Sequence, residues 1–345
     1  MSARRMVQVG GPVALVVATG LVGSLFARET EIYVISALVA TVIVVGLYVF
    51  VGNSGVLSFG HISFVAVGAW AAGVLSVPVD EKQGIFPELF PVLRDNTVGN
   101  VPSLLIAAAV GGAFALVAGL PLMRLSGLAA GIATFAVLEI THNVLRYWER
   151  IGPGTNSFSS VPETTGLLQA TIGAVIAIAV AFAYQVSRLG RQLRATREDP
   201  AAARAVGISV VRQRLWAFAI SGAVAGFAGG LYVHLLPLST EEMYLDLTFV
   251  TLAMLVIGGA TSLWGAVVGA LAVSGLDSFL AEAEEGVGVG SATLDLPTGS
   301  RIVVVGFLMA LVLIVRPAGL TGGRELSLPR LTRRPGPTVE GGAAK

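Results

Sequence analysis

Apolar runs of membrane-crossing length recur along almost the entire chain of 345 residues. A helix needs about 20 predominantly apolar residues to cross a bilayer. Only 12% of the residues are charged and the mean hydropathy is +0.82, whereas a soluble domain carries about a quarter charged residues. The sequence therefore predicts an all-α, polytopic membrane protein with about ten transmembrane helices, near residues 6–27, 32–51, 56–76, 102–123, 126–148, 167–187, 213–236, 245–261, 263–280 and 298–316.

The first apolar run follows Arg4 and Arg5 and has two interpretations. A cleaved signal peptide would share the basic start and the apolar stretch that follows it. The run is nevertheless long enough to cross a bilayer, at roughly 20 residues. We therefore favour an uncleaved N-terminal span over residues 1–27.

Charged residues divide between alternate loops. Basic residues in short loops keep those loops on the cytoplasmic side, so their distribution fixes the orientation. Ten spans with a cytoplasmic N-terminus place seven arginines between residues 188 and 214 inside, with only two acids among them. The other inner residues are Arg4, Arg5, Arg124, Arg316, Arg324, Arg330, Arg333, Arg334 and Lys345, and the outer acids are Glu29, Glu31, Asp80, Glu81, Glu88, Asp95, Glu241, Glu242, Asp246, Glu282, Glu284, Glu285 and Asp295. This predicts a multi-pass protein with both termini in the cytoplasm and a basic, disordered tail over residues 321–345.

The arginine-rich loop, residues 188–214, contains the signals of a short helix. Asp199 can cap it, Pro200 suits its first turn, and Gly207 can terminate it. One interpretation is an interfacial helix whose arginines bind anionic lipid headgroups. The other is a coupling helix that inserts into a cytoplasmic partner.

Two pairs of spans are interrupted by uncharged segments, residues 52–61 and 258–265. Non-helical backbone at membrane depth survives only where protein or a water-filled cavity satisfies its polar groups. Discontinuous helices of this kind line transport routes, although a tight hairpin at the membrane surface would give the same pattern. Close helix packing is predicted by the pairs Gly127–Gly131, Gly222–Gly226, Gly226–Gly230 and Gly265–Gly269. The candidate pathway residues are Asn53, Ser54, Ser58, His61, Gly258, Gly259, Thr261 and Ser262.

A few isolated polar residues lie inside apolar windows. Glu139 and Asn143 share one helix face, because they are four residues apart. A carboxylate in a span is costly and usually lies in a bundle interior or a cavity. We expect Glu139 to pair with His142, Arg146 or backbone. Asp277 and Arg301 lie near the outer ends of two late spans, where they could form an ion pair. His234 is expected near the outer surface.

The sequence also limits the chemistry. It contains no cysteine, which removes disulfides and thiolate metal sites. Its only lysines are Lys82 and Lys345, and no phosphate-binding loop of the Gly-x-x-x-x-Gly-Lys-Ser/Thr type occurs. The sequence thus predicts no catalytic residue, no metal site, no bound cofactor and no nucleic-acid partner. A primary transporter built on this chain must use ATP through partner subunits.

An ordered set of motifs gives a specific resemblance. They are residues 55–61 (GVLSFGH), 124–128 (RLSGL), 154–156 (GTN), 193–208 (LRATREDPAAARAVGI), 225–232 (AGFAGGLY), 258–265 (GGATSLWG) and 316–320 (RPAGL). Over residues 35–320 the chain resembles LivM-type permeases, the membrane subunits of ATP-binding-cassette (ABC) importers for branched-chain amino acids.

The resemblance implies a permease core over residues 28–320 in the inner (plasma) membrane. It implies a second homologous permease, two cytosolic ATPase subunits and an extracytoplasmic solute-binding protein as partners. It also implies that the loop at 188–214 couples to the ATPase. The matching positions are Arg194, Arg197, Glu198, Asp199, Ala202, Arg204 and Gly207.

Two positions depart from the family pattern, which often has glutamine at Val56 and glycine at Ser157. Both bear on which solute is carried, since similar permeases serve urea, short amides and other small solutes. A secondary transporter with broken helices is the alternative class. It would place coupling-ion ligands in the spans, where this sequence offers few carboxylates.

Overall fold

Each of the ten predicted windows forms one helix. The computed structural model describes residues 3–26, 28–86, 88–148, 150–151, 160–237, 243–285, 287–289, 292–294, 297 and 299–326. Seven described helices are long and apolar enough to cross a membrane, and three further apolar helices are shorter. The long ones are α1 (Ala3–Gly23), α2 (Arg28–Ser54), α6 (Asn100–Leu122), α7 (Gly127–Tyr147), α8 (Leu167–Val186), α11 (Val210–Val233) and α13 (Leu263–Glu285), and the short ones are α3 (His61–Ser76), α12 (Leu245–Gly258) and α14 (Ser300–Val315). The prediction of an all-α polytopic membrane protein is confirmed.

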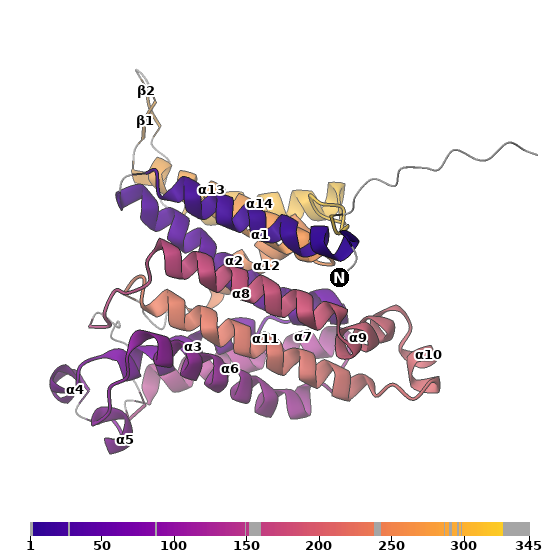
Figure 1. The fold of residues 1–345 in the computed structure, drawn as a ribbon, viewed down its shortest axis with the longest axis horizontal. Helices are drawn as coiled ribbons and strands as arrows, with labels where there is room; N and C mark the ends of the chain where they lie inside the picture. The colour runs from indigo at the N-terminus through magenta and orange to yellow at the C-terminus, as the bar shows by residue number, and fades with distance from the viewer. Residues whose placement is uncertain are drawn as a thin grey trace, which may run out of the picture.

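Four small helices and one hairpin lie at the two ends of the bundle. Figure 1 shows α4, α5 and the β1–β2 hairpin at one end, and α9, α10 and the start of α1 at the other. The bounds are Val79–Ile85 for α4, Pro91–Arg94 for α5, Arg188–Glu198 for α9 and Pro200–Ala205 for α10. β1 (Val287–Val289) pairs antiparallel with β2 (Ala292–Leu294), with Val287 opposite Leu294.

The chain order separates the charges as predicted. The turn with Arg124, the arginine-rich loop and Arg316 belong to the end that carries α10, which we call the basic end. Glu31, Asp80 and Glu284 belong to the opposite, acidic end. The predicted outer residues Glu241, Glu242 and Asp295, and the tail from residue 327 on, lie outside the described residues.

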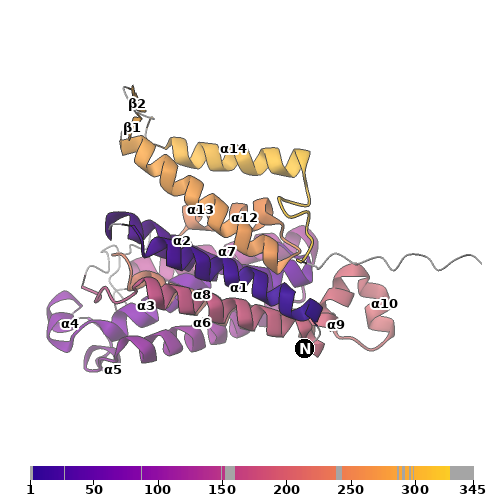
Figure 2. The ribbon, with the colours of Figure 1, turned by 45° about the horizontal axis from the view of Figure 1, so that its top comes forward.

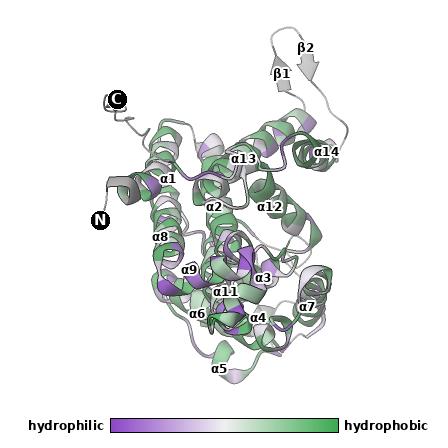
Figure 3. Cartoon of the chain, turned by 90° about the vertical axis from the view of Figure 1, so that its right-hand side faces the viewer, coloured by the Kyte–Doolittle hydropathy of each residue, from purple (hydrophilic) through white to green (hydrophobic). Residues whose placement is uncertain are grey.

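The core forms around α2 and α11, which are the most buried long helices. Helix α11 packs against α2, α3 and α6. Figure 3 looks along the bundle and shows α1 and α8 at one edge and α7 at the other. Helix α1 packs against α8, α2 and α13, so the N-terminal window belongs to the same bundle.

Glycines bring helix backbones into close contact at two crossings. A Cβ atom at Gly111 would lie 2.6 Å from Gly222 O, and one at Gly226 would overlap Ala107 O, so the backbones of α6 and α11 approach each other closely. A Cβ atom at Gly269 would likewise overlap Met254 O. Close contact between small residues is the usual packing device in membranes. The pair Gly127–Gly131 differs from the others, because nothing in the described part of the chain lies within 4 Å of a Cβ atom at Gly127.

Candidate functional site: coupling helices and interrupted helix pairs

The short helix predicted in the arginine-rich loop is confirmed as α10. Asp199 caps its N-terminus, since Asp199 Oδ1 accepts hydrogen bonds from Ala201 N at 2.8 Å and Ala202 N at 3.0 Å. These backbone bonds, chiefly the one from Ala202, lower the pKa of the Asp199 carboxyl below its ordinary value of 3.8. Pro200 occupies the first turn, and Gly207 ends the motif with φ +82°. The cap therefore stays ionised at neutral pH.

Helix α9 precedes α10 and is held to the bundle by two arginines. Arg194 Nη2 donates to Gln185 O at the end of α8, at 2.8 Å. Arg197 Nη1 donates to Gly52 O near the end of α2, at 2.7 Å. The same guanidinium pairs with Glu198, whose carboxylate is 72% exposed, at 2.8 Å. The loop is thus bonded directly to the first interrupted helix.

The stem of Arg197 also packs on Gly55, where the chain turns. Gly55 has φ +70°, a conformation that favours glycine. A Cβ atom at Gly55 would lie 2.8 Å from Arg197 Cγ. A larger residue at position 55 would therefore both strain the turn and displace Arg197.

Helix α10 projects from the basic end of the bundle (Figure 2), and most of its residues are exposed. Ala203 is its buried residue, whereas Ala201, Ala202, Arg204 and Ala205 are exposed. Val206, which follows them, is 76% exposed. A compact exposed apolar surface away from the membrane is typical of a protein-binding site. Val206 was not among the site residues predicted from the sequence. The signal that could have identified it is a valine directly before a helix-terminating glycine in a polar loop.

The first interruption, residues 55–60, is non-helical. Helix α3 therefore begins at His61, five residues later than the predicted window. His61 Nε2 contacts Ser221 Oγ in the middle of α11, so α3 starts inside the bundle and not at its end. Phe59 N donates to Thr134 Oγ1 of α7 at 3.1 Å. The backbone thus returns to membrane depth as an irregular segment, and α7 satisfies part of its hydrogen bonding.

The polar residues predicted for this segment are buried within the subunit. Asn53, Ser54, Ser58 and His61 are each at most 4% exposed. Ser58 Oγ bonds His61 Nδ1 at 3.0 Å. Asn53 Nδ2 donates to Val49 O at 3.1 Å, while its Oδ1 accepts no bond among the described residues. The exposed side chain of the segment is instead Leu57, at 49%.

A pocket of about 490 Å³ lies between this segment and the coupling helices. Its walls come from the 54–59 segment, the start of α7, helix α9, Pro200 and Arg214. Ser54 is the predicted pathway residue that lines it. The structure therefore brings the first interruption and the coupling loop together around one space at the basic end.

The second interruption, between α12 and α13, lies beneath the segment that follows α14. Thr321 N and Thr321 Oγ1 both donate to Gly258 O, at 3.2 Å and 2.8 Å. Gly259 turns the chain with φ +121°. Ser262 is fully buried and Thr261 is exposed, with Thr261 Oγ1 donating to Gly323 O at 3.3 Å. Residues 321–326, which the sequence assigned to a disordered tail, are packed on this turn.

Glu325 fixes the same segment to the start of α13. Its carboxylate accepts bonds from Leu263 N at 2.8 Å and Gln185 Nε2 at 3.1 Å. Gln185 also accepts from Tyr48 OH of α2 at 3.2 Å. The two interruptions are in contact as well, because a Cβ atom at Gly52 would lie 2.6 Å from Ala260 O.

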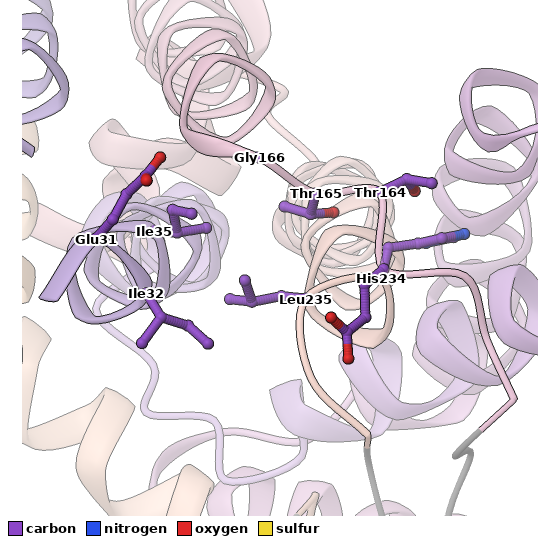
Figure 4. Close-up of a pocket in the computed structure, with 9 residues that line it drawn as sticks. Glu31, Ile32, Ile35, Thr164, Thr165, Gly166, His234 and Leu235 are labelled. Atoms are coloured by element: carbon purple, nitrogen blue, oxygen red, sulfur yellow. The ribbon is translucent and has the colours of Figure 1, made fainter. Parts of the chain in front are cut away.

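At the acidic end, a pocket of about 480 Å³ opens between α2 and the ends of α8 and α11. Figure 4 shows Leu235 extending toward Ile32 and Ile35 across this pocket, with Glu31 at its rim. His234 also lines the pocket and is buried, with Nε2 bonded to Ser76 Oγ at 2.9 Å. His234 lies at the outer end as expected, but it is inside the protein and not at the interface.

The isolated polar residues have defined partners. Asp277 and Arg301 form an ion pair at 3.4 Å, as suggested by the sequence. Glu139 accepts hydrogen bonds from Asn143 Nδ2 at 2.8 Å and from Tyr244 OH. Of the expected partners (His142, Arg146 or backbone), His142 interacts electrostatically with Glu139, whereas Tyr244 was not predicted. No local signal could have found it, because 105 residues separate Tyr244 from Glu139.

The described part of the chain is thus a bundle of ten apolar helices, with two interruptions beside a projecting helix pair. The branched-chain amino acid transport system / permease component family matches residues 30–314, and the chain belongs to that family. It is therefore a multi-pass permease subunit of the ABC-importer class, a class that works with partner permease and ATPase components.

Similar curated proteins agree with this assignment. The high-affinity branched-chain amino acid permease LivM of Salmonella typhimurium is 28% identical over 330 residues, covering 85% of this chain and 68% of LivM. LivH of the same organism is 24% identical over 300 residues, covering 82% of this chain and 91% of LivH. The autoinducer 2 import permease LsrC of an Enterobacter strain is 27% identical over 218 residues, covering 60% of this chain and 63% of LsrC. No solved structure matches the chain significantly.

Proposed function

We propose that this permease imports branched-chain amino acids with energy from ATP hydrolysed by partner subunits. The complex contains this chain, a second homologous permease, two cytosolic ATPases and an extracytoplasmic solute-binding protein. The substrate is supported by the names of LivM and LivH, which resemble this chain over most of its length. The observation that carries the coupling proposal is the bond from Arg197 of α9 to Gly52 of α2.

The coupling proposal follows from the mechanical layout. An ATPase that holds the exposed apolar surface of α10 would move α9 with it, because Asp199 caps α10 directly after α9 ends. Arg197 then transmits that motion to the end of α2 and to the non-helical segment that follows. The pocket between these parts changes shape when they move. We assign this pocket to the cytoplasmic end of the solute route.

The chain lies in the inner (plasma) membrane with its N- and C-termini in the cytoplasm. This orientation is supported by the arginines at the basic end, because basic loops stay on the cytoplasmic side. The chain itself binds no cofactor, and ATP is used only by the ATPase subunits. A cysteine introduced at Arg204 should react with an impermeant reagent only after permeabilisation, and one at Glu88 or Glu284 should react from outside. Labelling of Arg204→Cys from outside would overturn the orientation.

The function is tested with the complete complex in proteoliposomes that contain ATP. Leucine, isoleucine and valine should enter only when binding protein and ATP are both present, while urea and short amides should not. Uptake driven by an ion gradient without ATP would contradict the importer proposal. Selective uptake of urea or amides would contradict the assigned substrate.

A substitution in α10 tests its role as the coupling helix. Ala202→Glu places a charge on the exposed apolar surface of α10 and should uncouple ATP hydrolysis from uptake while the permease remains assembled. Ala195→Glu, at an exposed position of α9, is the matched control and should couple normally. Wild-type coupling in Ala202→Glu would refute the docking role of α10.

A further inference from the structure

One carboxylate is exposed within a membrane-spanning helix. Glu139 lies 12 residues after the first residue of α7, the helix Gly127–Tyr147. At 1.5 Å per residue, Glu139 is about 18 Å from the basic end of the helix, well inside a hydrocarbon core about 30 Å thick. Its side chain is nevertheless exposed in the isolated subunit.

Helix α7 has two different exposed sides. Residues on a helix are rotated by about 100° each. The exposed residues Ile140 and Val144 therefore lie on one side, about 100–140° around the helix from Glu139, and the exposed Asn143 lies on the side of Glu139, about 40° from it. The first side carries only apolar residues over these turns and suits contact with lipid. The second side carries exposed Ile132 and Phe135 closer to the basic end, and then a carboxylate and an amide over one turn, which lipid contact does not suit.

The carboxylate is held in place by groups from two helices. Asn143 Nδ2 donates to Glu139 Oε1 at 2.8 Å, and Tyr244 OH donates to Glu139 Oε2. Tyr244 directly precedes α12 and stacks on His142, with ring centroids 4.1 Å apart and an interplanar angle of 18°. The nearest arginine of α7, Arg146, lies seven residues on, about 10 Å along the axis, where its guanidinium contacts the Tyr147 ring.

The start of α12 is also at membrane depth. This helix has 14 residues and ends at the second interruption near the basic end, so Tyr244 lies about 20 Å from that turn. Discontinuous helices that start inside the membrane place substrate sites near the midplane in other transporters. Two independent elements, the polar side of α7 and the start of a short helix, therefore meet at Glu139.

We propose that Glu139, positioned by Asn143 and Tyr244, lines the solute route beside the second permease and binds the ammonium group of the transported amino acid. This inference rests on the proposed function. An ionised carboxylate facing lipid is strongly unfavourable, so a water-filled route is the environment that fits its exposure. The bonds from Asn143 and Tyr244 leave lone pairs on the Glu139 carboxylate that can accept further bonds from a cation.

A basic side chain of the second permease would offer the same chemistry as the solute, so the experiment must separate the two sources. The chain has no native cysteine, which permits single-cysteine variants Glu139→Cys, Asn143→Cys, Ile140→Cys and Val144→Cys. The complete complex is treated with an impermeant methanethiosulfonate trimethylammonium reagent during ATP turnover. The first two variants should react, the last two should not, and saturating leucine should slow the reaction of Glu139→Cys at least about fivefold. Equal reaction of all four, or reaction unaffected by leucine, would overturn the proposal.

Transport by Glu139→Gln gives the second measurement. At saturating binding protein, leucine uptake should fall about tenfold or more, since a charged hydrogen bond is worth at least the factor of ten in binding. ATP hydrolysis without solute and assembly of the complex should remain unchanged, as in the control Asp80→Asn at the acidic end. Loss of assembly would identify a contact with the second permease and refute the solute site. Equal leucine import by the wild-type complex and by Glu139→Gln would refute the role of Glu139 and leave the proposed function standing. A wild-type complex that imports no amino acid would refute the proposed function itself.

Discussion

Removing the Arg197 side chain should separate ATP hydrolysis from transport without dismantling the bundle. In Arg197→Ala, Gly52 O loses the hydrogen bond from Nη1 at 2.7 Å, and α9 loses its direct bond to α2. A hydrogen bond to a charged group contributes about 1.5–3 kcal/mol. The Arg197 side chain is 26% exposed, so solvent screening reduces this to about 1–2 kcal/mol. The contact between α9 and α2 should therefore weaken by about 5- to 30-fold.

The assay is the number of solutes imported per ATP hydrolysed by the reconstituted complex. Arg197→Ala should lower this ratio several-fold while ATP hydrolysis continues. The matched control is Glu198→Gln, which removes the exposed partner of the same arginine, and exposed ion pairs contribute about 0–1 kcal/mol. A normal ratio in Arg197→Ala, or a larger defect in Glu198→Gln, would show that α9 does not act through α2.

Three further predictions concern stability. Gly226→Val should destabilise the α6–α11 crossing by about 1–3 kcal/mol, the range for overpacking, and so lower the thermal midpoint. Gly306→Val should leave the midpoint unchanged, because none of the described residues lies within 4 Å of a Cβ atom at Gly306. Glu325→Gln should lower the free energy of unfolding by about 1 kcal/mol, because the negative charge at the start of α13 is lost. A fall in the thermal midpoint no larger than that caused by exposed Arg324→Gln would refute the capping role. Burial lowers the pKa of His234, and the bond to the Gly230 carbonyl opposes this shift. The unfolded state therefore takes up the proton first, and the thermal midpoint should fall as pH drops below the ordinary value of 6.5. His234→Gln should flatten this fall even though Glu31 and Glu163 line the same pocket, and an unchanged slope would contradict the prediction.

Local features of the chain were readable from the sequence. The apolar window predicted at 167–187 corresponds to the helix Leu167–Val186. The residues from Asp199 to Gly207 form the predicted short helix, with its cap and its terminating glycine. Both depend on hydropathy or on neighbouring residues, and these signals act within a few positions. The start of α3 was misplaced, because residues 56–60 are apolar or small yet non-helical, and hydropathy alone does not distinguish a helix from an irregular segment.

The contacts that assemble the candidate sites were not readable. Arg197 bonds a carbonyl 145 residues away, and the carboxylate of Glu325 binds α13 about 60 residues back. Tyr244 reaches Glu139 from a different helix. Each depends on how helices are placed in space, which no pattern of neighbouring residues specifies. The same applies to the burial of Ser58 and His61, which the sequence placed on the pathway.

If α10 docks on an ATPase subunit, a site-specific cross-link should join the two proteins. Ala202→Cys and Val206→Cys can be introduced singly into a chain without cysteine, with Asp80→Cys at the acidic end as the control. In inverted membrane vesicles that contain the complete complex, a short thiol-to-amine cross-linker should join both α10 variants to the ATPase subunit and leave Asp80→Cys unlinked. The yield should change when ATP is added, because hydrolysis moves the docked helix. Absence of cross-links from both α10 variants in an assembled, transporting complex would contradict the account.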